Sequence, residues 1–229
     1  MSGKTVLVTG ANRGLGLEFV RQYSGAGWHV HAACREPKEA HDLLHFAPEV
    51  DVHKLDVTHP QQIAALAREL EDEAIDLLIN NAGVIGPRGL TLGSLDYDAW
   101  LEVLEVNTLA PMRMAEAFVD NVARSEGKRV VSITSRMGSI GGSDGGGGYI
   151  YRSSKAALNA AMHTLSIDLA EREITVAVLH PGWVRTDMGG SGAVLSVEQS
   201  VTGMRRVIEA LTLKTSGRFF NYDGGEIAW

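Results

Sequence analysis

The sequence predicts a single α/β domain in which helices cover both faces of a doubly wound, seven-stranded parallel sheet. Short, apolar, β-branched segments alternate with longer amphipathic segments along the chain, as expected of parallel strands joined by helical crossovers. A glycine-rich turn stands directly between the first such strand and the first helix. The 229 residues, of which 45% are hydrophobic, suffice for one domain with a sizeable core. We therefore expect residues 1–229 to form one domain.

The order of the elements follows from the hydrophobic pattern and from glycine and proline positions. Strands are expected at residues 5–9, 28–34, 50–55, 75–79, 129–134, 175–179 and 218–222. Helices are expected at residues 15–26, from Pro60 onward, and at residues 96–125, 149–171 and 196–211. Thr58 is the expected N-cap of the second helix, and the third should bend near Pro111.

Composition and charge exclude several classes of protein. The net charge of −7, from 21 basic and 28 acidic residues, argues against a nucleic-acid surface. Cys34 is the only cysteine, which rules out an intramolecular disulfide and a thiolate metal cluster and fits a reducing compartment. No apolar run is long enough for a membrane span or a signal peptide. We expect a cytoplasmic protein without a metal site and without a nucleic-acid or membrane partner.

The glycine-rich turn reads Gly10-Ala11-Asn12-Arg13-Gly14-Leu15-Gly16. Glycines let the backbone approach a pyrophosphate, and the helix that follows offers free N–H groups and the positive end of its dipole. The spacing differs from the common G-x-G-x-x-G, and such residues can also form an ordinary tight turn. Their position between the first strand and the first helix favours a dinucleotide-binding Rossmann unit.

Tyr151 and Lys155 are four residues apart and therefore share one face of a helix. A cation beside a phenol lowers the phenol's pKa towards neutrality, so that it can exchange a proton with a carbonyl or an alcohol. Tyr149 suits this role less well, because Ser153 and not a cation follows it by four residues. Such pairs are common on exposed helices, so the assignment depends on the rest of the chain.

Two further features can be read as structure or as function. Asn107 lies inside a helical apolar run, where an asparagine more often makes structural hydrogen bonds than takes part in catalysis. Residues 138–148 contain seven glycines in eleven positions, which fits either an interdomain linker or the mobile rim of a pocket. The polar groups before and after this segment favour the rim.

Together these motifs resemble the short-chain dehydrogenase/reductase family. The resemblance covers nearly the whole chain and rests on six elements in order: the glycine turn, Asn80-Asn81-Ala82-Gly83, Asn107, Ser135, the Tyr151 and Lys155 pair, and Pro181-Gly182. Residues 151–159 and 217–229 are most similar to C-factor and Sniffer-type carbonyl reductases. The family implies an NADP-dependent oxidoreductase that reduces an aldehyde, ketone or quinone to an alcohol, and a homodimer formed through residues 96–125 and 149–171.

The resemblance also implies the catalytic roles. Tyr151 would be the general acid, and Lys155 would lower its pKa and hold the nicotinamide ribose. Ser135 would bind the substrate carbonyl, and Asn107 would anchor a water in a proton relay. Ser135 and Tyr151 are 16 positions apart, a few more than is usual in the family. If the glycine-rich loop did not fold back, Ser139 would compete for the serine role.

The residue that ends the second strand bears on the choice of cofactor. NAD-dependent members of the family have a carboxylate there, where this chain has Cys34. Glu36 follows two positions later and is the alternative ribose ligand, whereas Arg13 and Arg35 are suited to a 2′-phosphate. We therefore predict NADP(H). The predicted cofactor-binding residues are Gly10, Asn12, Arg13, Gly14, Leu15, Gly16, Arg35, Asp56, Val57, Asn81, Ala82, Gly83, Lys155, Pro181, Gly182, Val184 and Thr186.

The substrate pocket is expected at the carboxyl ends of the strands, where open α/β sheets bind ligands. Four apolar side chains follow those ends and either face a carbonyl substrate or belong to the core: Val84, Met137, Trp183 and Met188. A different class of function also fits, namely a C-factor-like signalling or sensor protein that binds a nucleotide and has vestigial catalysis. A nucleotide-sugar epimerase would need another glycine spacing and a longer C-terminal region.

Overall fold

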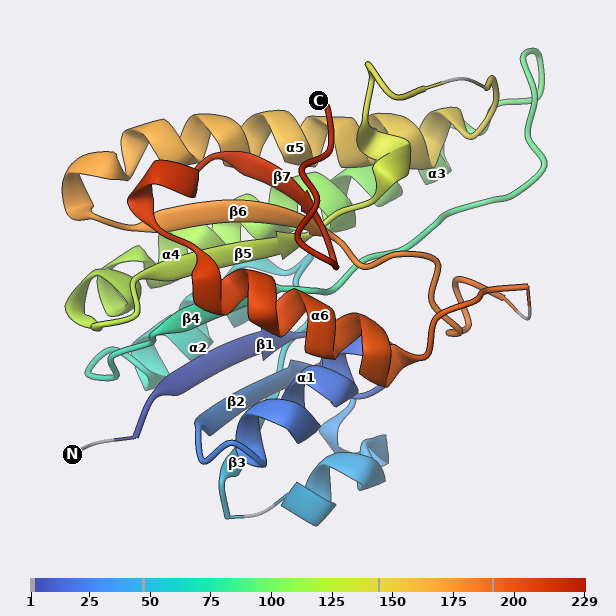
Figure 1. Ribbon diagram of the computed structural model, residues 1–229. Coiled ribbons are helices and arrows are strands. Elements are labelled where there is room, and N and C mark those ends of the chain that lie inside the picture. The colour runs from blue at the N-terminus through green and yellow to red at the C-terminus, as the bar shows by residue number, and fades with distance from the viewer. Residues whose placement is uncertain (1–2, 47, 144, 191) are drawn as a thin grey trace.

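The computed structural model describes residues 3–46, 48–143, 145–190 and 192–229. Within these residues, seven strands form one parallel sheet in the order β3-β2-β1-β4-β5-β6-β7 (Figure 1). The strands are β1 (Thr5–Thr9), β2 (His29–Cys34), β3 (Val50–Lys54), β4 (Leu77–Asn80), β5 (Arg129–Ile133), β6 (Thr175–His180) and β7 (Arg218–Asn221). The order reverses direction between β1 and β4, so the predicted doubly wound Rossmann fold is confirmed.

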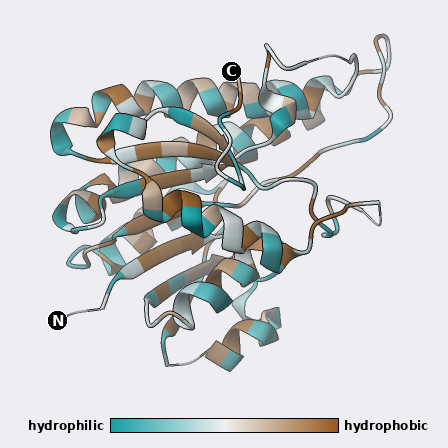
Figure 2. Ribbon diagram, viewed as in Figure 1, coloured by the Kyte–Doolittle hydropathy of each residue, from teal (hydrophilic) through white to brown (hydrophobic). Residues whose placement is uncertain are grey.

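Helices cover both faces of the sheet, and each face has its own apolar core. On one face, α1 (Gly14–Ser24) and α6 (Val197–Ala210) pack on side chains such as Val6 and Val8. On the other face, α2 (Pro60–Glu69), α4 (Ala110–Arg124) and α5 (Tyr149–Asp168) pack on side chains such as Leu7 and Leu78. Figure 2 shows the strands between them as predominantly hydrophobic. Burial on both faces explains why the strands read as continuous apolar runs.

The long helix predicted before Ser125 is divided. α3 (Tyr97–Leu104) passes through a π-helical turn (Glu105–Leu109) into α4. Pro111 has no N–H, and its ring would crowd the carbonyl oxygen four residues earlier, which belongs to Asn107. The wider π turn accommodates this proline. The expected irregularity near Pro111 therefore exists, and it places the buried Asn107 in a turn instead of a regular helix.

Smaller differences lie at the ends of elements. Thr58 is not the N-cap of α2, because His59 occupies that position and the Thr58 hydroxyl donates to Asp56. Two short 3₁₀ helices between β2 and β3, Pro37–Glu39 and His41–Phe46, were not predicted. One or two turns are too short to show the periodicity that reveals a longer helix.

The carboxyl ends of all strands face one edge of the sheet, to the right in Figure 1. Three long connections leave this edge: residues 81–96 after β4, residues 134–148 after β5 and residues 181–196 after β6. The predicted site residues lie mainly on these connections and on the turn after β1. In the described part of the chain, no helix combines the length and apolar character needed to cross a membrane.

Candidate active site

The turn after β1 has the backbone that its glycines predict. Gly10 and Gly14 have φ values of +64° and +54°, which L-residues with side chains rarely adopt. A Cβ atom on Gly16 would lie 2.1 Å from the Gly10 carbonyl oxygen, so no larger residue fits there. α1 begins at Gly14 without a side-chain cap. Its first N–H groups can therefore bind an anion such as a pyrophosphate.

Thr9 and Asn81 connect this turn to the end of β4. The Asn81 side chain donates from Nδ2 to the carbonyl oxygens of Thr9 (2.9 Å) and Gly10 (3.1 Å). The backbone N–H groups of Asn81 and Ala82 donate to the Thr9 hydroxyl at 3.0 and 3.1 Å. Asn81 therefore fixes the glycine turn through its side chain. Thr9 was not predicted as a site residue, although a hydroxyl directly before the first glycine is a recognisable signal.

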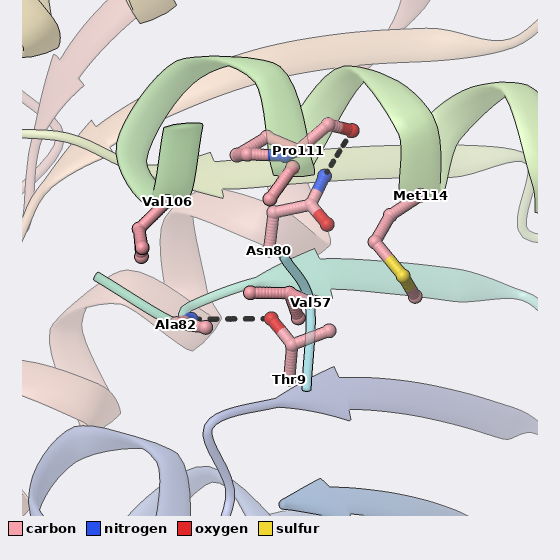
Figure 3. Close-up of a pocket in the computed structure, with 8 residues that line it drawn as sticks. Thr9, Val57, Asn80, Ala82, Val106, Pro111 and Met114 are labelled. Carbon is pink, nitrogen blue, oxygen red and sulfur yellow. Dashed lines mark hydrogen bonds between the residues drawn. The ribbon is translucent and has the colours of Figure 1, made fainter. Parts of the chain in front are cut away.

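A small hollow beside this network brings together ends of elements that are distant in sequence (Figure 3). Thr9 and Ala82 form one side of it, and the Ala82 N–H points at the Thr9 hydroxyl. On the opposite side, Asn80 donates from Nδ2 to the Pro111 carbonyl oxygen at 3.3 Å. Val57, which follows β3, completes the wall. Two predicted cofactor residues, Val57 and Ala82, therefore lie together at the centre of the carboxyl edge.

The turn after β5 folds back onto α5. Ser135 begins a 3₁₀ turn, and its hydroxyl accepts the N–H of Met137 at 3.1 Å. A Cβ atom on Gly138 would lie 2.8 Å from the carbonyl carbon of Lys155, so this glycine permits the close contact. Ser139 is 2% exposed and donates to the Ala228 carbonyl oxygen at 2.6 Å. The Ser139 hydroxyl thus holds the C-terminal segment, and Ser135 is the serine whose side chain lowers the pKa of Tyr151.

Burial controls the protonation of Tyr151 and Lys155. Burial raises the pKa of Tyr151, and the hydrogen bond with Ser135 offsets part of this rise. Burial lowers the pKa of Lys155 to about 8. Its ammonium lies 5.9 Å from the centre of the Tyr151 ring and donates to the Ile133 carbonyl oxygen at 2.9 Å. The expected lowering of the tyrosine pKa by Lys155 is therefore wrong for this structure, because desolvation of the phenol dominates.

Asn107 is fully buried and every polar atom of its side chain has a protein partner. Nδ2 donates to the Val84 carbonyl oxygen (2.8 Å) and to the Ser154 hydroxyl (2.9 Å), and Oδ1 accepts the Val84 N–H at 2.9 Å. Ser154 in turn donates to the Tyr151 carbonyl oxygen at 2.8 Å. The side chain thus joins the end of β4 to the helix that carries Tyr151. Ser154, which was not predicted, is the link.

Of the two predicted phosphate-binding arginines, Arg13 lies within the glycine turn and Arg35 directly follows β2. Arg13 is 2.9 Å from Asp187 of the loop after β6, with 70% and 83% of the two side chains exposed. Such an exposed pair is worth less than about 1 kcal/mol, so a phosphate can compete for the guanidinium. Arg35 follows β2, which ends at Cys34 as predicted. Burial tends to raise the pKa of Asp56, but Thr58 hydrogen bonds and the charges of His59 and Arg35 hold it below its usual value.

The remaining cofactor residues line the same edge. Asn12, Arg13 and Arg35 are exposed, whereas Gly83 faces Asn107 and the Lys155 ammonium. Gly182 has a φ of +81° and follows Pro181 at the end of β6. In the loop beyond, Val184 pairs with Leu195, and the Thr186 methyl group lies near Gly14.

The four predicted substrate residues are exposed apolar side chains and not core. Val84, Met137, Trp183 and Met188 are 39%, 38%, 56% and 37% exposed. They come from three different loops. Trp183 donates from Nε1 to the Gly189 carbonyl oxygen at 2.8 Å, which holds its own loop closed. Exposed apolar side chains on the loops at the carboxyl edge of a parallel sheet are typical of a binding surface.

The parallel sheet, the glycine turn and the Ser135, Tyr151 and Lys155 cluster define a nucleotide-binding oxidoreductase, and a family model confirms this class. The model for short chain dehydrogenase matches residues 4–193. The chain belongs to the short-chain dehydrogenase/reductase family.

Individual relatives place it more narrowly within the family. C-signal of Myxococcus xanthus is 46% identical over 155 residues, which cover 68% of this chain and 93% of that protein. The carbonyl reductase Sniffer of D. melanogaster superposes with a TM-score of 0.92 at 33% identity, covering 99% of this chain and 100% of the other. An NADPH-bound carbonyl reductase from chicken fatty liver has a TM-score of 0.91 at 36% identity, covering 100% of both chains. The predicted similarity to C-factor and Sniffer-type reductases is confirmed.

Proposed function

We propose that this protein is an NADPH-dependent carbonyl reductase with Tyr151 as its general acid. The observation that carries the proposal is the cluster of three side chains: the buried Lys155 ammonium lies 5.9 Å from the centre of the half-buried Tyr151 ring, and the Ser135 side chain offsets part of the rise in the pKa of that phenol. The substrate is an aldehyde, ketone or quinone, and the product is the alcohol. NADPH in the chicken relative supports the choice of cofactor. Bound NADPH supplies the hydride.

The cradle after β1 fits a dinucleotide. A Cβ on Gly16 would fill the space against Gly10, and the uncapped start of α1 leaves N–H groups for the pyrophosphate. The Lys155 ammonium has three N–H donors, and one of them binds the Ile133 carbonyl oxygen. The other two can bind further acceptors such as ribose hydroxyls. With its pKa at about 8, Lys155 is mostly charged at neutral pH.

The protein's part in the reaction is to supply a proton at a fixed position. Burial raises the pKa of Tyr151, so the phenol is protonated at neutral pH and can donate to the carbonyl oxygen as negative charge develops there. The Ser135 hydroxyl stabilises the same oxygen. The proposed role of Asn107 is changed from water anchor to positioning residue, because its side chain already binds Val84 and Ser154.

The proposal is tested by NADPH oxidation with a panel of aldehydes, ketones and quinones. Turnover of at least one carbonyl class, with formation of the matching alcohol, is the expected result. Saturable NADPH binding without turnover of any member would contradict the enzymatic proposal.

The phosphate preference is tested by Arg35→Asp. In this proposal the guanidinium forms charge-assisted hydrogen bonds with the 2′-phosphate, each worth about 1.5–3 kcal/mol. We expect the variant to lose roughly ten- to a hundredfold in NADPH affinity, with much smaller loss for NADH. Lys214→Asp, at the other edge of the sheet, is the charge-matched control. Equal weakening for both cofactors would contradict the assignment to the phosphate.

A signalling or sensor function is the second candidate, and the similarity to C-signal favours it specifically. A protein that only binds nucleotide has no need of the acid, whereas this chain has Tyr151 and Ser135 together with Lys155, whose ammonium lies 5.9 Å from the centre of the Tyr151 ring. The NADPH oxidation assay distinguishes the two candidates.

We further propose a single-domain, cytoplasmic protein that forms a homodimer through α4 and α5, which sedimentation at micromolar concentration would test.

A further inference from the structure

Four titratable side chains lie together on one face of the sheet, on β2 and β3. His29 and His31 alternate along β2, and Asp51 and His53 alternate along the edge strand β3. The parallel register pairs His31 with Asp51, so these alternating residues point to the same face. His29 begins β2 and Asp51 is the second residue of β3, which places these two side chains towards the amino ends of the strands. The active site lies at the carboxyl ends, to the right in Figure 1.

His29, His31 and Asp51 have the spacing of a metal-ligand set. One ring nitrogen from each histidine and one carboxylate oxygen of Asp51 all lie within 4.8 Å of one another. The His29 Nε2 atom is 3.0 Å from Asp51 Oδ2. Ligands about 2.0–2.1 Å from a tetrahedral ion are about 3.3 Å apart, so only small side-chain rotations are needed to close the set. His29 and Asp51 are 38% and 58% exposed, which leaves a path for the ion from solvent.

A chain of hydrogen bonds behind His31 fixes which of its nitrogens is free. Glu69 of α2 lies 3.2 Å from His53 Nδ1, and its carboxylate can only accept, so His53 carries a proton there. While His53 is neutral, its Nε2 is therefore an acceptor, and it lies 3.0 Å from His31 Nδ1. His31 then donates from Nδ1 and keeps a lone pair on Nε2. Carboxylate and imidazole partners commonly orient metal-binding histidines in this way.

The remaining nitrogen of His31, Nε2, has no hydrogen-bond partner among the described residues. His31 is 2% exposed, and its Nε2 is buried. Buried polar atoms are nearly always paired, and one left unpaired is costly.

We propose that His29, His31 and Asp51 bind a divalent transition-metal ion, with Zn²⁺ as the best fit and water completing the coordination. Two imidazoles and one carboxylate suit Zn²⁺ and its neighbours Co²⁺ and Ni²⁺, whereas Ca²⁺ and Mg²⁺ prefer oxygen ligands. His53 and Glu69 are positioning residues for His31. Because the ion would join β2 to the edge strand β3, its binding also stabilises the folded protein. The site is independent of the reductase chemistry.

Titration of the untagged, EDTA-treated full-length protein with ZnCl₂ in a calorimeter tests the proposal. We expect one ion per chain with micromolar or tighter affinity. Co²⁺ should give visible absorption bands of a four- or five-coordinate site. His29→Ala and Asp51→Asn change only partly exposed side chains, and each should weaken binding at least tenfold. His41→Ala removes an exposed histidine outside the cluster and should leave the affinity unchanged.

Glu69→Gln tests the hydrogen-bond chain without altering a ligand. Loss of the carboxylate removes the group that fixes the His53 proton, and affinity should fall about tenfold. Thermal unfolding of the metal-free protein should be unchanged in this variant, which separates positioning from a general structural role.

Three results would overturn the proposal: no saturable binding, binding that survives both His29→Ala and Asp51→Asn, or equal weakening by His41→Ala.

Discussion

The active-site region has a buried floor and an exposed rim, and the two are built differently. The floor consists of Thr9, Asn81, Asn107 and Ser154. Each of these side chains makes at least two hydrogen bonds. Most of these bonds join segments that are distant in sequence, and the one from Ser154 to Tyr151 lies within α5. The rim consists of the exposed apolar residues Val84, Met137, Trp183 and Met188. On the proposed function, the floor holds the cofactor-binding turn and the acid in place, and the rim is expected to contact the substrate without being needed for the fold.

This difference predicts separate effects of substitution. Removing one partner in the floor leaves buried polar groups unsatisfied, which costs about 1–3 kcal/mol per group. Removing a rim side chain costs little folding free energy, because that side chain is already largely in water. Floor variants should therefore change stability and turnover together, and rim variants should change substrate affinity alone.

Asn107→Ala should have the largest effect in the floor. It leaves the Val84 N–H and carbonyl oxygen without their partner and removes the donor to the Ser154 hydroxyl, so we expect a loss of about 2–4 kcal/mol in the free energy of unfolding. Because Ser154 leads to Tyr151, turnover at a temperature where the variant is folded should also fall at least tenfold. Urea unfolding and steady-state kinetics measure the two effects.

Asn121→Ala is the matched control for Asn107→Ala. Asn121 is also buried and donates to two carbonyl oxygens, those of Leu70 and Glu73, but lies near the amino ends of the strands. It should lose comparable stability and keep the turnover of the folded enzyme. If both variants lose turnover equally, Asn107 has no special role at the site.

His180 extends the comparison to pH. Burial and the charge of Arg136 lower its pKa to about 4, against the opposing effect of Asp223. As pH falls from 6.5 towards 4, the unfolded chain binds a proton at this residue before the folded protein does, so stability is lost in that range. Between pH 7.5 and pH 5 the free energy of unfolding should fall by about 2 kcal/mol less in His180→Gln than in the parent protein.

Urea unfolding at the two pH values measures this difference. His45→Gln, at an exposed histidine, is the control and should keep the pH dependence of the parent. An unchanged pH dependence in His180→Gln would show that the charged form of this residue is tolerated in the fold.

Trp183→Ala should have the smallest effect, and it tests the rim. The indole is 56% exposed, so the loss of apolar contact with substrate should raise KM by up to about tenfold while kcat changes less than about threefold. Leu213→Ala, an exposed residue at the other edge of the sheet, is the control. A large fall in kcat with constant KM would contradict this role and would show that Trp183 contributes to the catalytic step.

The sequence predicts the elements that have strong local signals. The alternation of strands and helices, the glycine turn and the end of β2 at Cys34 all follow from apolar runs, glycines and charges that are close in sequence. The Tyr151 and Lys155 pair is visible for the same reason, because one helix turn joins the two residues.

The features that the sequence does not reveal depend on contacts between distant segments. The π turn at Asn107 and the use of Ser139 by the C-terminal segment require knowledge of what packs against them. The direction of the Tyr151 pKa shift depends on burial, which a helical spacing does not report. The histidine cluster on β2 and β3 appears only when the strand register is known, because in sequence its residues alternate as ordinary strand residues do.

Replacement of Tyr151 by phenylalanine tests the central claim most directly. Tyr151→Phe removes only the phenolic oxygen, so kcat for carbonyl reduction should fall at least about a hundredfold, as expected for loss of a general acid. The NADPH dissociation constant should stay within about twofold of the parent value. Tyr149→Phe, two residues away and 40% exposed, is the control and should keep full activity. Retention of turnover in Tyr151→Phe would contradict the assignment of the acid.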